Sequence, residues 1–136
     1  MFILGIGRAF VAALVIGLAV VGTAGPARAD IHDYQFVLLE PEVKTGDSAI
    51  VSARLVHKPT GRPVSDAIVF ARRIDMAPED MEAMTSPLEP LPDTEPGVYR
   101  FKTNLSMEGS WRLSLAAKVQ GETGTVESRL VLKAAP

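Results

Sequence analysis

The sequence predicts an all-β fold, an immunoglobulin-like antiparallel β-sandwich of six to seven strands preceded by a signal-peptide helix. Three observations lead to this prediction. Apolar and polar residues alternate most clearly through residues 111–119, which is the pattern of a half-buried strand. Short stretches rich in glycine and proline separate several such runs, and the sequence between them has no long amphipathic helical pattern. Short strands at this spacing are typical of a β-sandwich.

Residues 1–29 have the three parts of a secretory signal peptide. Arg8 supplies a positive charge, an apolar run follows it, and residues 27–29 read Ala-Arg-Ala, the small-x-small pattern that signal peptidase accepts. We therefore expect cleavage before Asp30, which leaves one domain of residues 30–136. The alternative is an uncleaved membrane anchor, although the apolar run is shorter than the ~20 residues that span a bilayer.

Six runs after the leader are expected to form strands. The run at 67–71 is apolar on both faces, as expected of a central strand, and the others alternate. The six runs are 34–38, 51–55, 67–71, 99–101, 111–119 and 126–132. Turn signals lie at 45–47, 59–63, 104–109 and 121–124.

Charge and cysteine content exclude several classes of protein. Without Arg8 and Arg28, 12 of the 14 basic residues remain against 16 acidic ones, a net charge of about −4. This balance is far from that of a nucleic-acid-binding protein, so we expect no nucleic-acid partner. The sequence has no cysteine, which excludes disulfides, thiolate metal sites and thiol catalysis. The hydrophobic core must therefore stabilise the fold without covalent cross-links.

The segment 73–96 interrupts the regular spacing of strands and is expected to be a long loop rich in methionine and proline. Connections of this length in a compact domain are usually functional or disordered. Residues 77–80, Ala-Pro-Glu-Asp, have proline and acidic residues where the first turn of a helix prefers them. The sequence therefore predicts a helix of one or two turns inside this loop.

Three of the four methionines that follow the leader, Met76, Met81 and Met84, lie within nine residues, and Met107 lies in a predicted turn. On a helical turn Met81 and Met84 would share a face, and Met76 could fold back beside them. Thioether sulfur is a soft ligand that suits Cu(I) or Ag(I). Methionine also fills gaps where a loop packs on a core, so packing is the alternative.

Cleavage before Asp30 would create a second candidate metal site. The new terminus would read Asp30-Ile31-His32, in which the free amine, two deprotonated backbone amides and the imidazole could enclose Cu(II) or Ni(II) in a square plane. The alternative is a histidine without a function at an unstructured terminus. A cut one residue away would destroy this motif.

The sequence gives no indication of an enzyme. The motifs Gly-x-Ser-x-Gly and His-Glu-x-x-His do not occur, and neither does a glycine-rich phosphate-binding loop. We therefore expect no catalytic residues.

An ordered set of motifs resembles the YtkA-like and FixH-like family over residues 48–132. It comprises Thr-Gly-Arg-Pro-Val at 60–64, Asp-Met-Ala-Pro at 75–78 with Met81 and Met84, Pro-Gly-Val-Tyr-Arg-Phe at 96–101, and Gly-Ser-Trp-Arg-Leu at 109–113. The resemblance implies an immunoglobulin-like domain outside the inner membrane that is associated with copper handling. The partner would be a membrane complex of heavy-metal efflux or of oxidase assembly.

Two functions are consistent with these observations. The first is a periplasmic accessory protein that holds Cu(I), or Ag(I), through Met76, Met81, Met84 and Met107. The second is a protein-interaction module without a metal, in which the methionine- and proline-rich loop forms an adaptable apolar surface. In both, contact with the membrane is expected only if the leader stays uncleaved and anchors the protein.

Overall fold

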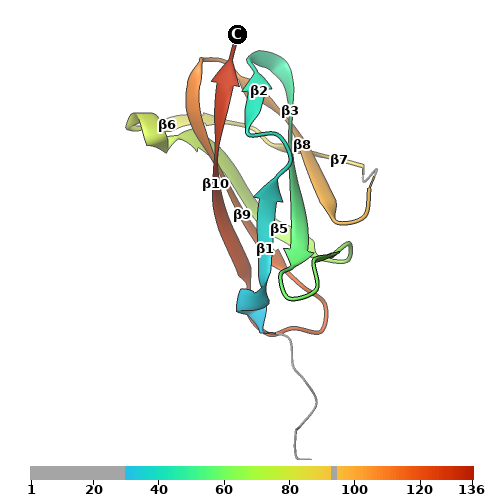
Figure 1. The fold of residues 1–136 in the computed structure, drawn as a ribbon. Helices are drawn as coiled ribbons and strands as arrows, with labels where there is room; N and C mark the ends of the chain where they lie inside the picture. The colour runs from blue at the N-terminus through green and yellow to red at the C-terminus, as the bar shows by residue number, and fades with distance from the viewer. Residues whose placement is uncertain (1–29, 93–94) are drawn as a thin grey trace, which may run out of the picture.

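The structure, a computed structural model, describes residues 30–92 and 95–136, which form two facing β-sheets (Figure 1). In the first sheet the strand order is β1 (Tyr34–Leu38), β3 (Gly46–His57), β8 (Val98–Leu105) and β7 (Glu89–Leu91), with β4 (Arg62–Pro63) also paired to β3. In the second sheet the order is β2 (Glu42–Lys44), β10 (Val126–Ala135), β9 (Gly109–Lys118), β5 (Ile68–Met76) and β6 (Met81–Ser86). This arrangement confirms the predicted all-β sandwich.

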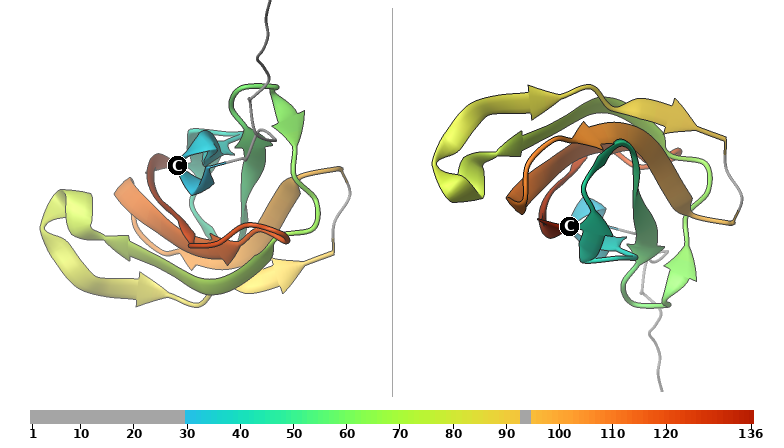
Figure 2. Two further views of the ribbon diagram at one scale, coloured as in Figure 1. Left: turned by 90° about the horizontal axis from the view of Figure 1, so that it is seen from below. Right: turned by 90° about the horizontal axis from the view of Figure 1, so that it is seen from above.

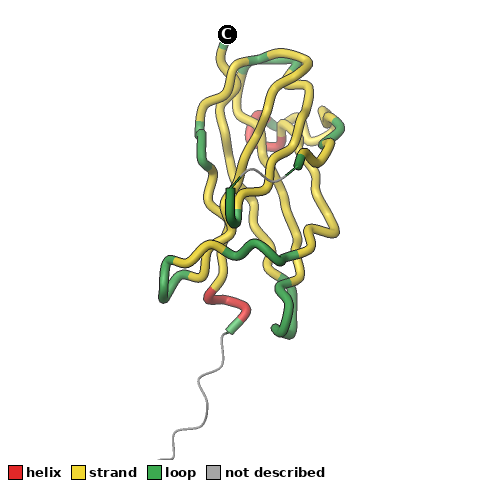
Figure 3. Tube along the Cα trace, turned by 90° about the vertical axis from the view of Figure 1, so that its right-hand side faces the viewer, coloured by secondary structure: helices red, strands yellow, loops and turns green. Residues whose placement is uncertain are grey.

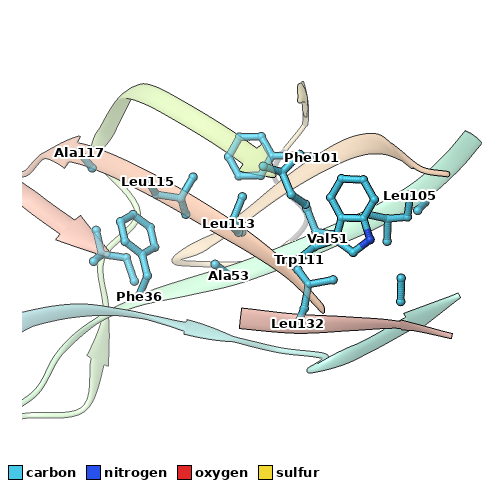
Figure 4. Packing of buried hydrophobic residues seen from close by; sticks show 14 of the residues in the cluster. Phe36, Val51, Ala53, Phe101, Leu105, Trp111, Leu113, Leu115, Ala117 and Leu132 are labelled. Carbon is cyan, nitrogen blue, oxygen red and sulfur yellow. The ribbon is translucent and has the colours of Figure 1, made fainter. Parts of the chain in front are cut away.

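Alternation along the strands builds the core. In β9, Trp111, Leu113 and Leu115 are buried while the residues between them are half-buried on the opposite face. Side chains from both sheets fill the space between the layers (Figure 4). Burying a side chain of this size stabilises the fold by roughly 1.5–3 kcal/mol, so these inward rows hold the two sheets together.

The structure has more strands than the sequence predicts. Beyond the six predicted runs, each of which lies within or overlaps a strand, the described residues contain four others, of which β2, β4 and β7 have two or three residues each. Runs this short carry no periodic signal. In addition, β2 pairs with β10 in parallel, a departure from the antiparallel expectation. The predicted signal-peptide helix lies outside the described residues.

The segment 73–96 is not the loop that its composition predicts. It holds the end of β5, a 3-10 helix η4 (Ala77–Glu79), strand β6 and strand β7. Pro78 lies in the first turn of η4, but η4 ends after three residues, where Asp80 adopts the left-handed conformation with φ 59°. The chain then turns back as β6 instead of continuing as a helix. Figure 3 shows η4 as a short helical turn among the strands.

The end of β5 and the start of β9 lie at the same end of the sandwich. Asp75 near the end of β5 pairs with Arg112 near the start of β9, so Met76 lies beside the turn that joins β8 to β9. The end-on views in Figure 2 show η4 and the start of β6 at one side of the molecule and β7 at the other. The topology therefore brings the turn that carries Met107 to the end of the sandwich where the other methionines lie.

Candidate metal site

Two of the predicted ligands, Met76 and Met81, are cross-strand partners at the closed end of the β5–β6 hairpin. The pair lies where the β5–β6 register shifts, and Met76 there has φ −101° and ψ 38°, so the two residues are adjacent across the hairpin without the geometry of a regular strand pair. Met76 has no exposed surface and Met81 is half-buried. The helical face predicted for Met81 and Met84 is wrong, because both lie on strand β6.

Met76 and Met81 line a groove of about 410 Å³ at this end of the sandwich. The C-terminal residues of β10 form another wall. The remaining lining residues are Glu79, Glu108, Gly109, Lys133, Ala134, Ala135 and Pro136. The groove thus combines two soft thioethers with two carboxylates and one ammonium group.

Gly109 makes room for the end of the Met76 side chain. An ideal Cβ at position 109 would lie 3.0 Å from Met76 Cε and 3.0 Å from Glu79 Oε2, and the backbone there has φ +130°. Glu79 is held in place because its Oε2 accepts a hydrogen bond from the Ser110 amide at 2.8 Å. Glycine at this position therefore lets η4 and β9 approach each other around Met76.

The other two predicted ligands do not line the groove. Met84 is half-buried and packs against the core cluster, as Met81 also does, and Met76 belongs to that cluster, so all three have the packing role that the alternative expects of methionine. Met107 is 40% exposed, and its carbonyl oxygen accepts a hydrogen bond from Trp111 Nε1 at 3.0 Å. The residue after Met107, Glu108, does line the groove. Met107 is therefore adjacent to the site, and Met84 is apart from it.

Asp75, which has no exposed surface, anchors the turn that carries Glu79. Its Oδ1 accepts a hydrogen bond from the Ala77 amide at 2.9 Å, while Oδ2 lies 2.8 Å from Arg73 Nε and 3.3 Å from an Arg112 guanidinium nitrogen. Burial alone would raise the pKa of Asp75, but the Ala77 amide and the two guanidinium groups outweigh it and lower the pKa below its ordinary value. The buried carboxylate is therefore ionised and fixes the start of η4.

The candidate Cu(II) residues Asp30, Ile31 and His32 form an ordered turn. Asp30 caps the 3-10 helix η3 (Ile31–Asp33), and its Oδ1 accepts from the His32 amide at 2.9 Å and lies 2.9 Å from His32 Nδ1. In return, Asp33 accepts from the Asp30 amide at 3.2 Å. This capping box brings His32 to Asp30, but it also occupies an amide that a square-planar ion would need.

Several residues of the groove were not predicted from the sequence. Glu79 was interpreted as part of a helix start, and Glu108, Gly109 and Lys133 were not predicted to line a site. Of these residues, only Glu108 and Gly109 could have been recognised from the sequence, because they follow Met107 in the predicted turn. Lys133 reaches the groove because β10 pairs with β9, which places Lys133 opposite Ser110. This long-range pairing cannot be inferred from the local sequence.

Comparison with known families settles the family. A family model described as YtkA-like matches residues 28–116, about two thirds of the chain. The chain belongs to the YtkA-like family. The match begins earlier and ends earlier than the resemblance over 48–132. No curated protein sequence matches the chain.

The YtkA-like family and its β-sandwich are not typical of enzymes. Within residues 30–92 and 95–136, no helix is long and apolar enough to cross a membrane. The same part of the chain contains no group of three or more His, Cys, Asp or Glu side chains placed to hold a metal ion.

Proposed function

We propose that this YtkA-like protein is a metal-binding accessory protein that holds Cu(I), or Ag(I), outside the cytoplasm for heavy-metal efflux or cuproenzyme assembly. The observation that carries the proposal is the pairing of Met76 with Met81 across the β5–β6 hairpin, with both side chains lining one groove. Met107 does not line the groove, but it lies on the adjacent turn at the same end of the sandwich.

The chemistry of the donors supports this choice of ion. Thioether sulfur is uncharged and soft, and it favours Cu(I) over the harder divalent ions. Thioethers also do not form disulfides, which suits a site in an oxidising compartment. The nearby carboxylates Glu79 and Glu108 offset the charge of the ion and of Lys133.

The exported location rests on the sequence of residues 1–29, with its charged start, apolar run and Ala-Arg-Ala end. The partner is proposed to be a membrane complex of metal efflux or oxidase assembly, as the resemblance to the YtkA-like and FixH-like family implies. A leader that stays uncleaved would tether the domain to the outer face of the inner membrane.

A Cu(I) titration against a competing chelator tests the proposal. Replacing Met81 with leucine removes a thioether from the groove while keeping an apolar side chain of similar size. The Met81→Leu variant is expected to bind Cu(I) at least about tenfold more weakly. Met84→Leu is the matched control, because Met84 lies on the same strand but does not line the groove, and its affinity should stay unchanged.

The interaction module without a metal is the competing function, and one observation favours it. Met107 is one of the exposed large apolar side chains and lies on the turn beside the groove. If Cu(I) does not bind and a membrane-complex partner co-purifies in the presence of a chelator, the groove serves a protein partner instead.

A further inference from the structure

The outward face of the second sheet carries a cluster of basic side chains. The pairing of β5, β9 and β10 places their residues in rows across the sheet. In one row Arg73 pairs with Ser114, and Ser114 pairs with Arg129. In the next row Asp75 pairs with Arg112, and Arg112 pairs with Val131. Residues of the same parity on these strands share the face turned away from the core. Its basic members are Arg73, Arg112, Lys118, Arg129 and Lys133.

Acidic side chains offset only part of this charge. In the described residues of β5, β9 and β10, the outward positions carry two carboxylates, Asp75 and Glu127. Glu82 of the adjacent strand β6 adds a third, 3.8 Å from Arg112. The face therefore has a local excess of positive charge in a chain whose net charge is −2. Such a segregated patch attracts anionic partners.

A groove of about 300 Å³ crosses this face. Small side chains from adjacent strands, Ala71, Ser114 and Ala116, leave the space open between Arg73 and Arg129. The groove therefore spans three strands, with Arg73 on one side and Arg129 together with the carboxylate of Glu127 on the other.

The two arginines differ in how they are held. Arg73 is engaged by Asp75 and by the Glu82 carbonyl oxygen. Arg129 is exposed and forms no hydrogen bond or ion pair within residues 30–92 and 95–136, so its guanidinium fork is available. Phe70, the extra residue where the β5–β9 register shifts, is 54% exposed next to Ala71. Phe70 does not line the basic groove but a neighbouring hollow with Thr85 and Leu88.

We propose that this groove binds an acidic, extended segment of a partner protein, with a carboxylate of that segment held by Arg129. Guanidinium groups bind carboxylates bidentately, and the concave floor of small residues admits a side chain that a flat lipid surface would not fill. The groove between Arg73 and Arg129 shares no lining residue with the methionine groove, so the proposal goes beyond the proposed metal binding and does not depend on it.

Fluorescence anisotropy with a labelled peptide of six glutamates tests the proposal on the purified protein. The glutamate peptide is expected to bind, more weakly as salt is raised, and a peptide of six glutamines is expected not to bind. Arg129→Gln should weaken binding about tenfold, as expected for loss of a charge-assisted hydrogen bond. Arg62→Gln makes the same charge change on the exposed strand β4 and should leave binding unchanged.

Three results would overturn the proposal. They are no binding of the glutamate peptide, equal loss of affinity in Arg129→Gln and Arg62→Gln, or sedimentation with phosphatidylglycerol vesicles in the absence of peptide binding. The last result would assign the basic face to an anionic membrane. If Arg129→Gln has the same free energy of unfolding in urea as the native protein, a loss of binding is not caused by a loss of the fold. The Cu(I) titration is a separate readout, so either proposal can fail alone.

Discussion

The Asp75 carboxylate, which has no exposed surface, accepts a hydrogen bond from Arg73 Nε at 2.8 Å. Its other oxygen accepts from the Ala77 amide, so the same carboxylate ties β5 to the first residue of η4. The groove depends on that turn, because Met76 precedes it and Glu79 ends it. The position of the proposed metal ligands therefore rests in part on a buried ion pair next to them.

Replacing Asp75 with asparagine is expected to destabilise the domain by about 2 kcal/mol, because two guanidinium groups lose their charged partner. The value is below that for a fully enclosed pair, since the Arg73 side chain is 50% exposed. Urea unfolding measures the change. Asp66→Asn, in an exposed loop, should alter the free energy of unfolding by less than about 0.5 kcal/mol. Equal effects of the two variants would contradict the structural role of Asp75.

The lowered pKa of Asp75 predicts a specific pH dependence of stability. A carboxyl with a lower pKa in the folded than in the unfolded protein stabilises the fold fully above its unfolded pKa of about 4. This contribution is lost as the pH falls through the folded pKa. The difference in unfolding free energy between the native protein and Asp75→Asn should be constant at neutral pH and shrink below about pH 4. A difference that disappears already near pH 6 would be inconsistent with this pKa direction.

Gly109 provides a test of the close approach between η4 and β9. Alanine there would place its Cβ 3.0 Å from Met76 Cε on a backbone with φ +130°. Gly46→Ala is the matched control, because Gly46 has φ +151° but nothing within 4 Å of the added Cβ. We expect Gly109→Ala to lower the free energy of unfolding by about 1 kcal/mol more than Gly46→Ala. Equal losses would mean that the Met76 contact is easily relieved.

Strands with strict alternation could be predicted from the sequence, and strands defined by their partners could not. The alternation through 111–119 predicts β9 directly, because each inward residue is buried. The sequence of strand β6 does not alternate in this way, and its pairing with β5 is irregular. Asp75 pairs with Thr85 whereas Met76 pairs with Met81, which leaves residues 82–84 outside regular pairing. The two prolines on either side of β6 further favour a loop interpretation.

The same distinction applies to the site. The clustering of Met76 and Met81 is visible in the sequence, and their proximity is confirmed, although through a hairpin and not a helix. The location of Met107 depends on how the chain passes between the sheets, so the sequence left it open. Lys133 enters the groove only through long-range pairing. Spacing along the chain thus indicates candidate ligands but not the walls around them.

The amino-terminal site makes a prediction that depends on the cut before Asp30. A protein that begins at Asp30 is expected to bind one Cu(II), and binding must break the bond from the His32 amide to Asp30 Oδ1. His32→Ala should abolish this binding, as should one extra alanine before Asp30. Visible absorption of the Cu(II) complex measures it, and mass spectrometry of the exported protein tests the cut. Unchanged binding by the extended protein would place the ion elsewhere.

X-ray absorption at the copper edge of the Cu(I)-loaded protein tests whether thioethers of the groove bind the metal. We expect sulfur neighbours around copper, with fewer in Met81→Leu and the native number in Met84→Leu. Nitrogen and oxygen neighbours alone, or a sulfur contribution unchanged in Met81→Leu, would contradict this expectation.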